Sequence, residues 1–566
     1  LADFSATGTR ELVADDYVYG IKRLAHPHLH SPILGLMSGY INGLGDFASH
    51  LQKSALARRR EAWLDLREYP LDGVKVIDRY HYRIRIKGKY PQFLYWLAMP
   101  FFSPMPWEAD KFYSQPGLVK KNITLDWYPV GTGPYMLTEN NPNARMVLQR
   151  NPNFHDERYP CEGEAEDKNN GLLKDCGQRL PLIDQVVFTR EKEQIPYWNK
   201  FLQGYYDASG ISSDAFDQAV QVVGGGEAAL TDAMQTQGIT LSTTVATSTF
   251  YMGFNWLDSL TGGNNPATAE RARLLRQAIS IAINQEEFIS IFQNGRGVAA
   301  QGPIPPGIFG YREEKAGINP YMYDWVDGKA RRKPIIEAKR LLAKAGWPSG
   351  RDAVTGEPLV IYLDTTATGV GSKARMDWLQ KQLGQIDVQL VVRNTDYNRF
   401  QEKIRKGAAQ IFYFGWNADY PDPENFLFLL SSQQSSVLHD GSNAANYSNA
   451  LYDSLFAQVQ TMENSPQRQA LIDQMVAQLR HDAPWIWGFH PKDYSLQHAW
   501  LMNRKPGKVG NNTLKYQRID ASLREAKRAE WNRPIRWPLL FLALGSAAVF
   551  GLIFRAYRRR ERRAMS

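Results

Sequence analysis

The sequence predicts a mixed α/β protein with one membrane-length helix near its C-terminus. Of its 566 residues, 43% are hydrophobic and 22% are charged, which is typical of globular chains and outside the range of disordered ones. Within residues 359–414, short segments with strand character alternate with segments of helical period. Because this alternation is typical of βαβ units, we expect a lobe built on a parallel or mixed sheet.

The first part of the chain predicts a helix followed by two pairs of strands. Residues 11–25 carry apolar residues at helical spacing, and residues 74–86 alternate apolar and polar side chains as a two-sided strand pair does. Residues 130–150 predict strand, turn and strand, because Asn and Pro residues mark the turn.

The second half predicts helices before and within the βαβ lobe. Residues 270–293 have helical period, and residues 337–346 predict a helix that ends on Gly346, a residue suited to a helix C-terminus. The lobe itself is expected to contain strands at 359–364, 388–392 and 410–414 and helices at Met376–Leu383 and Tyr397–Lys406.

The charge is unevenly placed along the chain. The formal net charge is +9, but residues 503–566 carry +12 and residues 1–502 carry −3. The basic character therefore belongs to the tail. A neutral to slightly acidic body argues against a nucleic-acid partner, which needs a phosphate-binding surface.

Residues 537–554 are an uncharged apolar segment that begins with Trp537 and is followed by a run of arginines. A helix of this length spans roughly 27 Å, close to the thickness of a bilayer core. A buried terminal helix is the alternative, but a core helix would hardly end in arginines. The positive-inside rule places residues 555–566 in the cytoplasm and the body outside, a signal that the basic residues before the span weaken.

The two cysteines, Cys161 and Cys176, lie in a polar stretch of the sequence. No further Cys or nearby His pair completes a zinc site. In an oxidising compartment we expect a disulfide that closes a local insertion and contributes about 3 kcal/mol. Two free surface thiols are the alternative.

Catalytic motifs are absent from the sequence. There is no GxSxG and no HExxH, and GTGPY at 131–135 lacks the Lys-Ser/Thr ending of a phosphate-binding loop. His26, His28 and His30 could bind a transition metal, but Pro27 interrupts them and a surface loop is the favoured interpretation. We therefore expect no enzyme, no cofactor and no metal site.

The most informative stretch is FYFGWNADYPDPENFL at 412–427. An apolar strand leads to Trp416 and then to Asp419 in a Pro-rich loop. An aromatic face beside a carboxylate suits a ligand with a cationic group and a variable apolar body. The alternative is a capped turn in which Asp419, Asp422 and Glu424 are merely solvated, and spacing alone favours that alternative.

Six segments of the chain resemble, in order, the signature segments of the peptide-binding solute receptors of ABC importers, solute-binding family 5. The GTGPY and RNPNF pattern, the Ala-rich helix, the Pro-Pro loop and the GWNADY segment together make the resemblance specific. The segments are ELVADDYVYGIKRL (11–24), VGTGPYMLTE with VLQRNPNF (130–154), RQAISIAINQEEFISIF (276–292), RGVAAQGPIPPG (296–307), EAKRLLAKAGWP (337–348) and GWNADYPDPENFL (415–427).

The resemblance implies the two-lobed type II fold of periplasmic binding proteins, with an extra subdomain in the first lobe. The C-terminal span is atypical of this family, and the opening strands of the first lobe and an export signal are expected upstream of Leu1. The expected division is 1–125 extra subdomain, 126–246 first lobe, 247–490 second lobe, 491–515 return to the first lobe, 516–536 tether, 537–554 transmembrane helix and 555–566 basic cytoplasmic tail.

The same resemblance implies a ligand site between the lobes. Asp419 is expected to bind the α-amino group of a peptide, with Trp416 as a neighbouring wall and Asn417 beside it. The segment STFYMGFNW at 248–256 matches a family strand near the cleft. Its candidate ligand-binding residues are Tyr251, Phe254, Asn255 and Trp256.

Three functions are compatible with these features. The first is a membrane-tethered peptide receptor in the periplasm, anchored to the inner membrane, that delivers its ligand to an ABC permease pair and its ATPases. The second is a receptor for another solute, such as a nickel complex, a glycoside or a murein peptide. The third is a scaffold or sensor whose cleft is vestigial.

Overall fold

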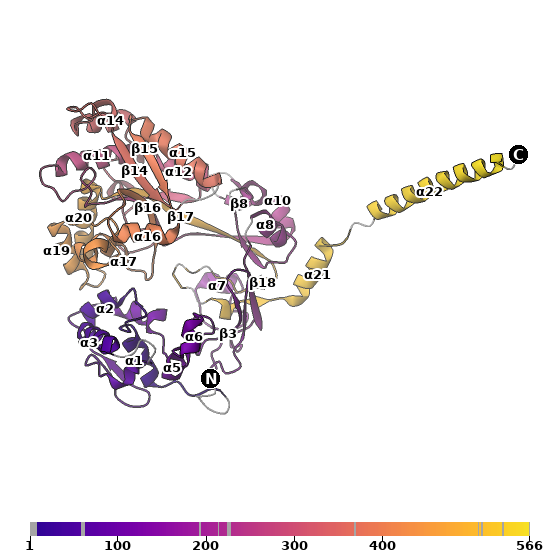
Figure 1. The fold of residues 1–566 in the computed structure, drawn as a ribbon, viewed down its shortest axis with the longest axis horizontal. Coiled ribbons are helices and arrows are strands. Elements are labelled where there is room, and N and C mark those ends of the chain that lie inside the picture. Colours follow the sequence, from indigo (N-terminus) through magenta and orange to yellow (C-terminus); the bar gives the residue numbers. More distant parts are fainter. Residues whose placement is uncertain are drawn as a thin grey trace.

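The computed structural model describes residues 8–57, 63–191, 194–212, 214–222, 228–366, 370–505, 507, 509–510, 513–534 and 537–564. The three largest clusters of buried side chains in this part of the chain lie in an N-terminal subdomain, a first lobe and a second lobe. Figure 1 shows the second lobe above the N-terminal subdomain, with the first lobe joining them at one side. The fold is mixed α/β, as predicted.

The second lobe is built on the main part of an eight-stranded sheet, in the order β11-β17-β10-β16-β14-β15, and β6 and β9 of the first lobe pair with the far half of β17. Strand β14 runs parallel to both β15 and β16, while β10 is antiparallel to β16. Helices α15 and α16 make the two crossovers, so the predicted βαβ lobe is confirmed. The elements are β10 Ser248–Phe254, β11 Gly297–Ala299, β14 Val360–Thr365, α15 Val370–Gly384, β15 Gln389–Asn394, α16 Tyr397–Arg405, β16 Ile411–Asn417 and β17 Trp485–His498.

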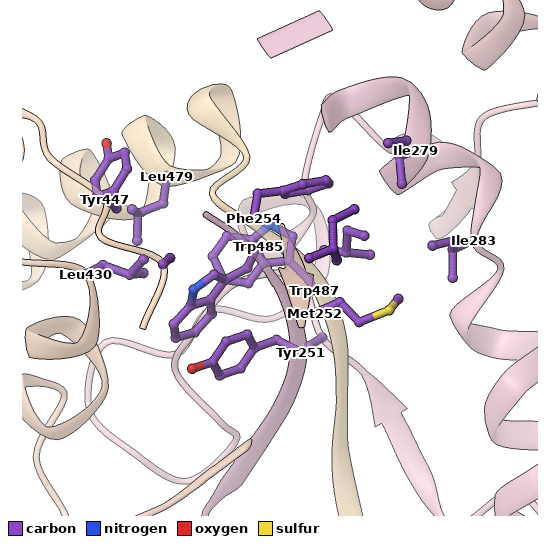
Figure 2. Close-up of a cluster of buried hydrophobic side chains, with 14 of the residues drawn as sticks. Tyr251, Met252, Phe254, Ile279, Ile283, Leu430, Tyr447, Leu479, Trp485 and Trp487 are labelled. Atoms are coloured by element: carbon purple, nitrogen blue, oxygen red, sulfur yellow. The ribbon is translucent and has the colours of Figure 1, made fainter. Parts of the chain in front are cut away.

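The core of the second lobe lies under helices that cover this sheet. Tyr251 and Trp485 stack with ring centroids 3.5 Å apart, and Trp487 packs beside them (Figure 2). The helical segment predicted at 270–293 is two helices, because the side chain of Asn284 accepts a hydrogen bond from the Glu287 amide and caps the second. The helices of this lobe are α11 Ala269–Ala282, α12 Gln285–Gln293, α13 Glu314–Gly317, α14 Ile335–Lys344, α17 Glu424–Leu427, α18 Ser436–His439, α19 Ala450–Val459 and α20 Pro466–Asp482, with a hairpin of β12 Tyr323–Val326 and β13 Lys329–Arg332.

The N-terminal subdomain has a core of its own. The buried face of α1 includes Val18, Tyr19 and Ile21, as its helical spacing predicted. Strands β1 and β2 pair antiparallel as the predicted strand pair. The elements are α1 Ala14–Arg23, α2 Leu34–Tyr40, α3 Leu44–Ala57, β1 Val74–Val76, β2 Tyr82–Ile84, α4 Phe93–Leu97, α5 Trp107–Tyr113 and α6 Pro116–Lys120.

The first lobe contains the predicted strand–turn–strand, extended to three strands by β5. It joins the second lobe through two strand connections, because β9 continues into β10 and because β17 pairs with β10 in its first half and with β9 in its second. Its elements are β3 Tyr135–Asn141, β4 Arg145–Arg150, α7 Ala165–Asn169, β5 Gln185–Thr189, α8 Gln194–Leu202, β6 Ala208–Gly210, α9 Phe216–Ala219, β7 Val220–Val222, β8 Ala228–Leu230, α10 Asp232–Thr236 and β9 Ile239–Val245.

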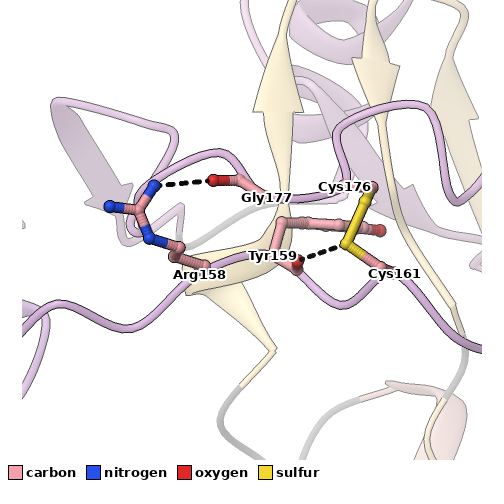
Figure 3. Close-up of a disulfide and its surroundings, with 5 residues drawn as sticks. All are labelled: Arg158, Tyr159, Cys161, Cys176 and Gly177. Atoms are coloured by element: carbon pink, nitrogen blue, oxygen red, sulfur yellow. Dashed lines mark hydrogen bonds between the residues drawn. A yellow bond between two sulfur atoms is a disulfide. The ribbon is translucent and has the colours of Figure 1, made fainter.

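Cys161 and Cys176 form the predicted disulfide, with their Cα atoms 4.6 Å apart. Figure 3 shows the bridge between the two cysteines. The closed loop contains α7, and its buried side chains, Asp167 and Asp175, are polar. A side chain outside the bridge also holds this loop, because the Arg158 Nη1 donates a hydrogen bond to the carbonyl of Gly177 at 3.0 Å. Closing a loop of this length contributes about 3 kcal/mol in the chain-entropy model.

The stretch expected to be a tether contains a helix that packs on the body. Helix α21, Ala521–Trp531, places the Trp531 ring 5.5 Å from that of Trp500. The guanidinium of Arg528 lies over the ring of Tyr205 at 4.7 Å. A short pair of β18 Leu501–Met502 and β19 Arg518–Ile519 precedes it, and α22, Trp537–Ala564, then projects away from the body (Figure 1).

Candidate functional site

The candidate residues of 412–427 lie at the carboxyl edge of the second-lobe sheet. Strands β14 and β15 end level with each other there, at Thr365 and Asn394, and β16 continues past them to Asn417 and into the loop that carries Asp419. In open α/β sheets ligands bind outside the carboxyl ends of the strands, because the loops there are free to supply polar groups. This edge is therefore the part of the lobe that suits a ligand best.

Asp419 is a carboxylate without a cationic partner among the described residues. Its side chain is exposed, and its Oδ2 accepts one hydrogen bond, from the Asn425 Nδ2 at 3.2 Å. The surrounding atoms raise the pKa of Asp419 above its ordinary value, and the Asn425 hydrogen bond opposes that rise. A charge that is both reachable and partly desolvated is stabilised by an arriving cation.

Asn425 holds this site together, although the sequence analysis did not identify it. It is completely buried, and its Oδ1 accepts hydrogen bonds from the Asp419 amide at 2.8 Å and from the Trp416 Nε1 at 3.2 Å. The Trp416 ring also meets Phe428 edge-on at 5.4 Å. The sequence shows that Asn425 is a polar residue inside the matched motif. It does not show that Asn425 is buried, because burial depends on long-range packing.

Asn417 lies at the same edge and is tied to β10. The Ser248 Oγ donates a hydrogen bond to the Asn417 Oδ1 at 2.8 Å, and the two residues are register partners. The Nδ1–H of the buried His490 donates to the Ser248 carbonyl at 3.0 Å. Burial lowers the pKa of His490 to about 4, so this imidazole is neutral at physiological pH. Ser248 and His490 are contributors that the sequence analysis missed.

The other four candidates lie in the core or at the opposite edge. Because β10 is antiparallel to β16, Phe254 pairs with Ile411, roughly 20 Å along the strand from Asn417. The buried Asn255 donates to the Gly407 carbonyl at 2.9 Å, and Trp256 packs under the guanidinium of Arg276 at 4.1 Å. Tyr251 is 1% exposed against Trp485. The structure therefore brings Trp416, Asn417 and Asp419 together and leaves these four apart from them.

Asp422 and Glu424 are buried, so the alternative in which they are solvated turn residues is wrong. Asp422 is 4% exposed and Glu424 is 1% exposed. Both oxygens of Asp422 accept from the guanidinium of Arg468, at 2.7 and 2.8 Å. The loop thus contains one carboxylate that is fully paired and one, Asp419, that is not.

Among the described residues, no group of three or more His, Cys, Asp or Glu side chains is placed to hold a metal ion. The rings of His26 and His28 lie 5.7 Å apart, and burial lowers the pKa of His26 to about 4. A cavity of about 490 Å³ lies in the second lobe between Arg312 and α20, and it is lined by none of the candidate residues.

The two lobes and the residues at the carboxyl edge define a solute-binding receptor. The family model of the bacterial extracellular solute-binding proteins, family 5, matches residues 7–436. The chain belongs to this family, whose members are substrate-binding receptors rather than enzymes.

Individual relatives are similar over most of the chain at low identity. Heme-binding protein A of Haemophilus influenzae is 23% identical over 89% of this chain and 75% of its own length. The periplasmic oligopeptide-binding protein OppA of Salmonella typhimurium is 22% identical over 87% and 78%. The periplasmic binding protein DppA of Helicobacter pylori, solved with the peptide STSA, superposes with a TM-score of 0.64 at 18% identity, covering 90% of this chain and 82% of that one. The Helicobacter pylori structure shares the two-lobed fold.

Proposed function

We propose that the chain is the receptor of an ABC-type peptide importer and that Asp419 binds the α-amino group of the ligand. The observation that carries the proposal is the contrast within one loop between Asp422, which Arg468 neutralises, and Asp419, which no described cation neutralises. A ligand ammonium group would neutralise the charge of Asp419 and donate a charge-assisted hydrogen bond to its carboxylate. The neighbouring Trp416 offers an apolar wall that tolerates different side chains.

The named ligands of the relatives divide between peptides and other solutes. The relatives include both a heme-binding and an oligopeptide-binding protein. A free carboxylate at the carboxyl edge favours a cationic ligand group, and a peptide has one at its N-terminus. Capture between the lobes and transfer to a permease pair with its ATPases is the role that follows.

Native mass spectrometry of the full chain in detergent tests this function. Incubated with an equimolar mixture of tripeptides, their N-acetylated forms and heme, the chain should gain mass equal to the free-amine peptides and not to the acetylated ones or to heme. Adducts with heme alone, or equal binding of both peptide forms, would contradict the proposal.

We further propose that α22 anchors the receptor in the membrane. The helix has 28 residues, and its apolar segment of 18 residues is long enough to cross a bilayer. None of that segment is buried against the rest of the described structure. Because α21 packs on the first lobe up to Trp531, and the Asn532 Nδ2 donates to the Gln203 carbonyl at 3.0 Å, only residues 533–536 separate the packed body from the span. The five Cα–Cα steps from Asn532 to Trp537 reach at most about 18 Å, so the first lobe is held close to the membrane.

Protease treatment of right-side-out spheroplasts should digest the body and leave a C-terminal tag intact, because the arginines after the span favour the cytoplasmic side. Immunoblotting against the tag and against the body reads the result. A tag removed from outside would reverse the orientation, and release of the whole chain by osmotic shock would refute the anchor.

A further inference from the structure

The loop that presents Asp419 has a second face that is buried against the N-terminal subdomain. Asp419 is exposed, whereas the next residue, Tyr420, is 2% exposed and belongs to the buried cluster of that subdomain. The ring of Tyr420 lies 5.4 Å from Trp96 and stacks on Tyr95 at 5.6 Å. One short segment therefore touches both the candidate ligand position and a unit more than 300 residues away in sequence.

Glu424 is the polar centre of this contact, which we call the seam and define as Tyr40, Tyr90, Tyr420, Glu424 and Gln460. The Tyr90 Oη donates to the Glu424 Oε2 at 3.4 Å, and the Tyr420 Oη donates to the same oxygen. The Gln460 Nε2 donates to the Glu424 Oε1 at 3.3 Å and to the Tyr40 Oη at 3.1 Å. Tyr40 and Tyr90 stack with centroids 3.8 Å apart. Figure 1 places α2, which ends at Tyr40, beside α17 and away from the strands that join the lobes.

The seam is mechanically connected to Asp419 through Asn425. Glu424 and Asn425 are consecutive residues of α17, and Asn425 binds the Asp419 amide and carboxylate. The Asp422–Arg468 pair fixes the preceding turn, because the Asp422 Oδ1 also accepts from the Glu424 amide at 2.9 Å. A movement of Glu424 relative to the subdomain must therefore move Asn425 and, with it, the carboxylate of Asp419.

We infer that Tyr40 and Tyr90 are positioning residues for ligand binding, which act through Glu424 and Asn425 on the carboxylate of Asp419. The inference rests on the proposed function of Asp419 and assigns these two tyrosines to the contact that forms when the N-terminal subdomain closes onto the second lobe. A bound ammonium fixes Asp419 and favours the closed seam, and a closed seam holds Asp419 ready for the ammonium.

The titration of Glu424 gives this coupling a pH dependence. Burial raises the pKa of Glu424 to about 7 in the closed seam, with Asp422 adding to the rise and with Tyr420, Gln460 and Arg468 opposing it. Tyr90 and Tyr40 face it from the subdomain and stay neutral, because burial raises their pKa values as well. Opening exposes Glu424 and returns its pKa toward the ordinary value, so closure binds a proton and weakens as the pH rises toward 7.

The test compares Tyr90→Phe with Tyr95→Phe in the full chain in detergent. Tyr90→Phe keeps the stacked ring and removes the hydroxyl that reaches Glu424. Tyr95→Phe removes an exposed hydroxyl that contacts no partner among the described residues, while its ring still stacks on Tyr420. Hydrogen exchange of the Asp419 amide, followed by mass spectrometry without ligand, should accelerate in Tyr90→Phe only. Equal exchange in the two variants would overturn the coupling, whether or not the chain binds peptides.

Binding of trialanine and of N-acetyl-trialanine then measures the effect on Asp419. Tyr90→Phe should weaken binding of free trialanine by about three- to ten-fold, the effect of losing the hydrogen bond to Glu424, while Tyr95→Phe leaves it unchanged. The hydroxyl of Tyr90 also accepts from the Trp96 Nε1 at 2.9 Å, a contact inside the N-terminal subdomain. If the parent binds neither peptide, the proposed function fails while the exchange result still decides the coupling. Closure of the parent should weaken from pH 5 to pH 7.5, and Glu424→Gln should abolish that dependence. A pH profile that survives Glu424→Gln would overturn the role of Glu424.

Discussion

Replacing Asp419 with asparagine is expected to weaken the binding of a free-amine peptide by about thirty-fold or more. The substitution keeps the shape of the side chain and its ability to accept from the Asn425 Nδ2, but it removes the charge. Leaving an ammonium unpaired in a closed, water-poor site costs about 2–5 kcal/mol, and every 1.4 kcal/mol is a factor of ten in dissociation constant. Isothermal titration calorimetry of the full chain in detergent measures the difference.

Asp396→Asn is the matched control for this variant. Asp396 is an exposed carboxylate just beyond β15, the edge strand of the same sheet, and its Oδ1 caps α16 by accepting from the Arg399 amide at 3.0 Å. Asparagine caps a helix about as well, so affinity should stay within about twofold of the parent. If Asp419→Asn also binds as tightly as the parent, Asp419 is a turn residue, and the vestigial-cleft alternative gains the stronger support.

Arg468→Met is expected to lower the free energy of unfolding by about 3–5 kcal/mol. Arg468 is 1% exposed and binds both oxygens of Asp422, the Val459 carbonyl and the Asn464 Oδ1. Without it, the carboxylate of Asp422 is buried and unpaired, which is far more costly than losing an exposed pair. Chemical denaturation followed by tryptophan fluorescence gives the measurement.

Two further variants separate the charge effect from lost packing. Arg312→Met breaks an exposed ion pair with Asp473, which lies on α20 as Arg468 does. This variant should lower the free energy of unfolding by no more than about 1 kcal/mol. The double variant Asp422→Asn with Arg468→Met removes both charges and should recover part of the lost stability. A loss for Arg468→Met equal to that of Arg312→Met would mean that the Asp422 pair is not buried in solution.

The sequence was sufficient to predict the elements whose periodicity is local. The βαβ lobe at 359–414 follows from alternating strand and helix periods, and the end of α14 follows from Gly346, which adopts a positive φ of 91° beyond the last helical residue. The break between α11 and α12 was missed because apolar spacing continues across Asn284, so only the cap of the second helix marks it.

The candidate site was only partly predictable, for a reason visible in β10. Its residues match a strand near the cleft, but periodicity does not tell which end of a strand faces the ligand edge. The antiparallel register with β16 puts Ser248 at that edge and Phe254 at the other. In the same way, Tyr90, the partner of Glu424 in the N-terminal subdomain, lies more than 300 residues earlier, so no local pattern could show that this acidic residue is buried.

The C-terminal region shows the limit of composition as a guide. Residues 516–536 are polar and basic, which predicted a tether. Helix α21 nevertheless packs on the first lobe, because Trp531 contacts the rings of Trp500 and His498 and because Arg528 lies over the ring of Tyr205. A few aromatic contacts decide the position of a helix whose overall composition is hydrophilic.

A crystal structure of the chain with a bound free-amine tripeptide tests the central claim most directly. We expect the peptide ammonium to lie within hydrogen-bond distance of the Asp419 carboxylate, about 2.7–3.2 Å, with Trp416 beside the first side chain and the seam closed. A peptide whose ammonium is paired elsewhere, while Asp419 keeps only its hydrogen bond from Asn425, would contradict it.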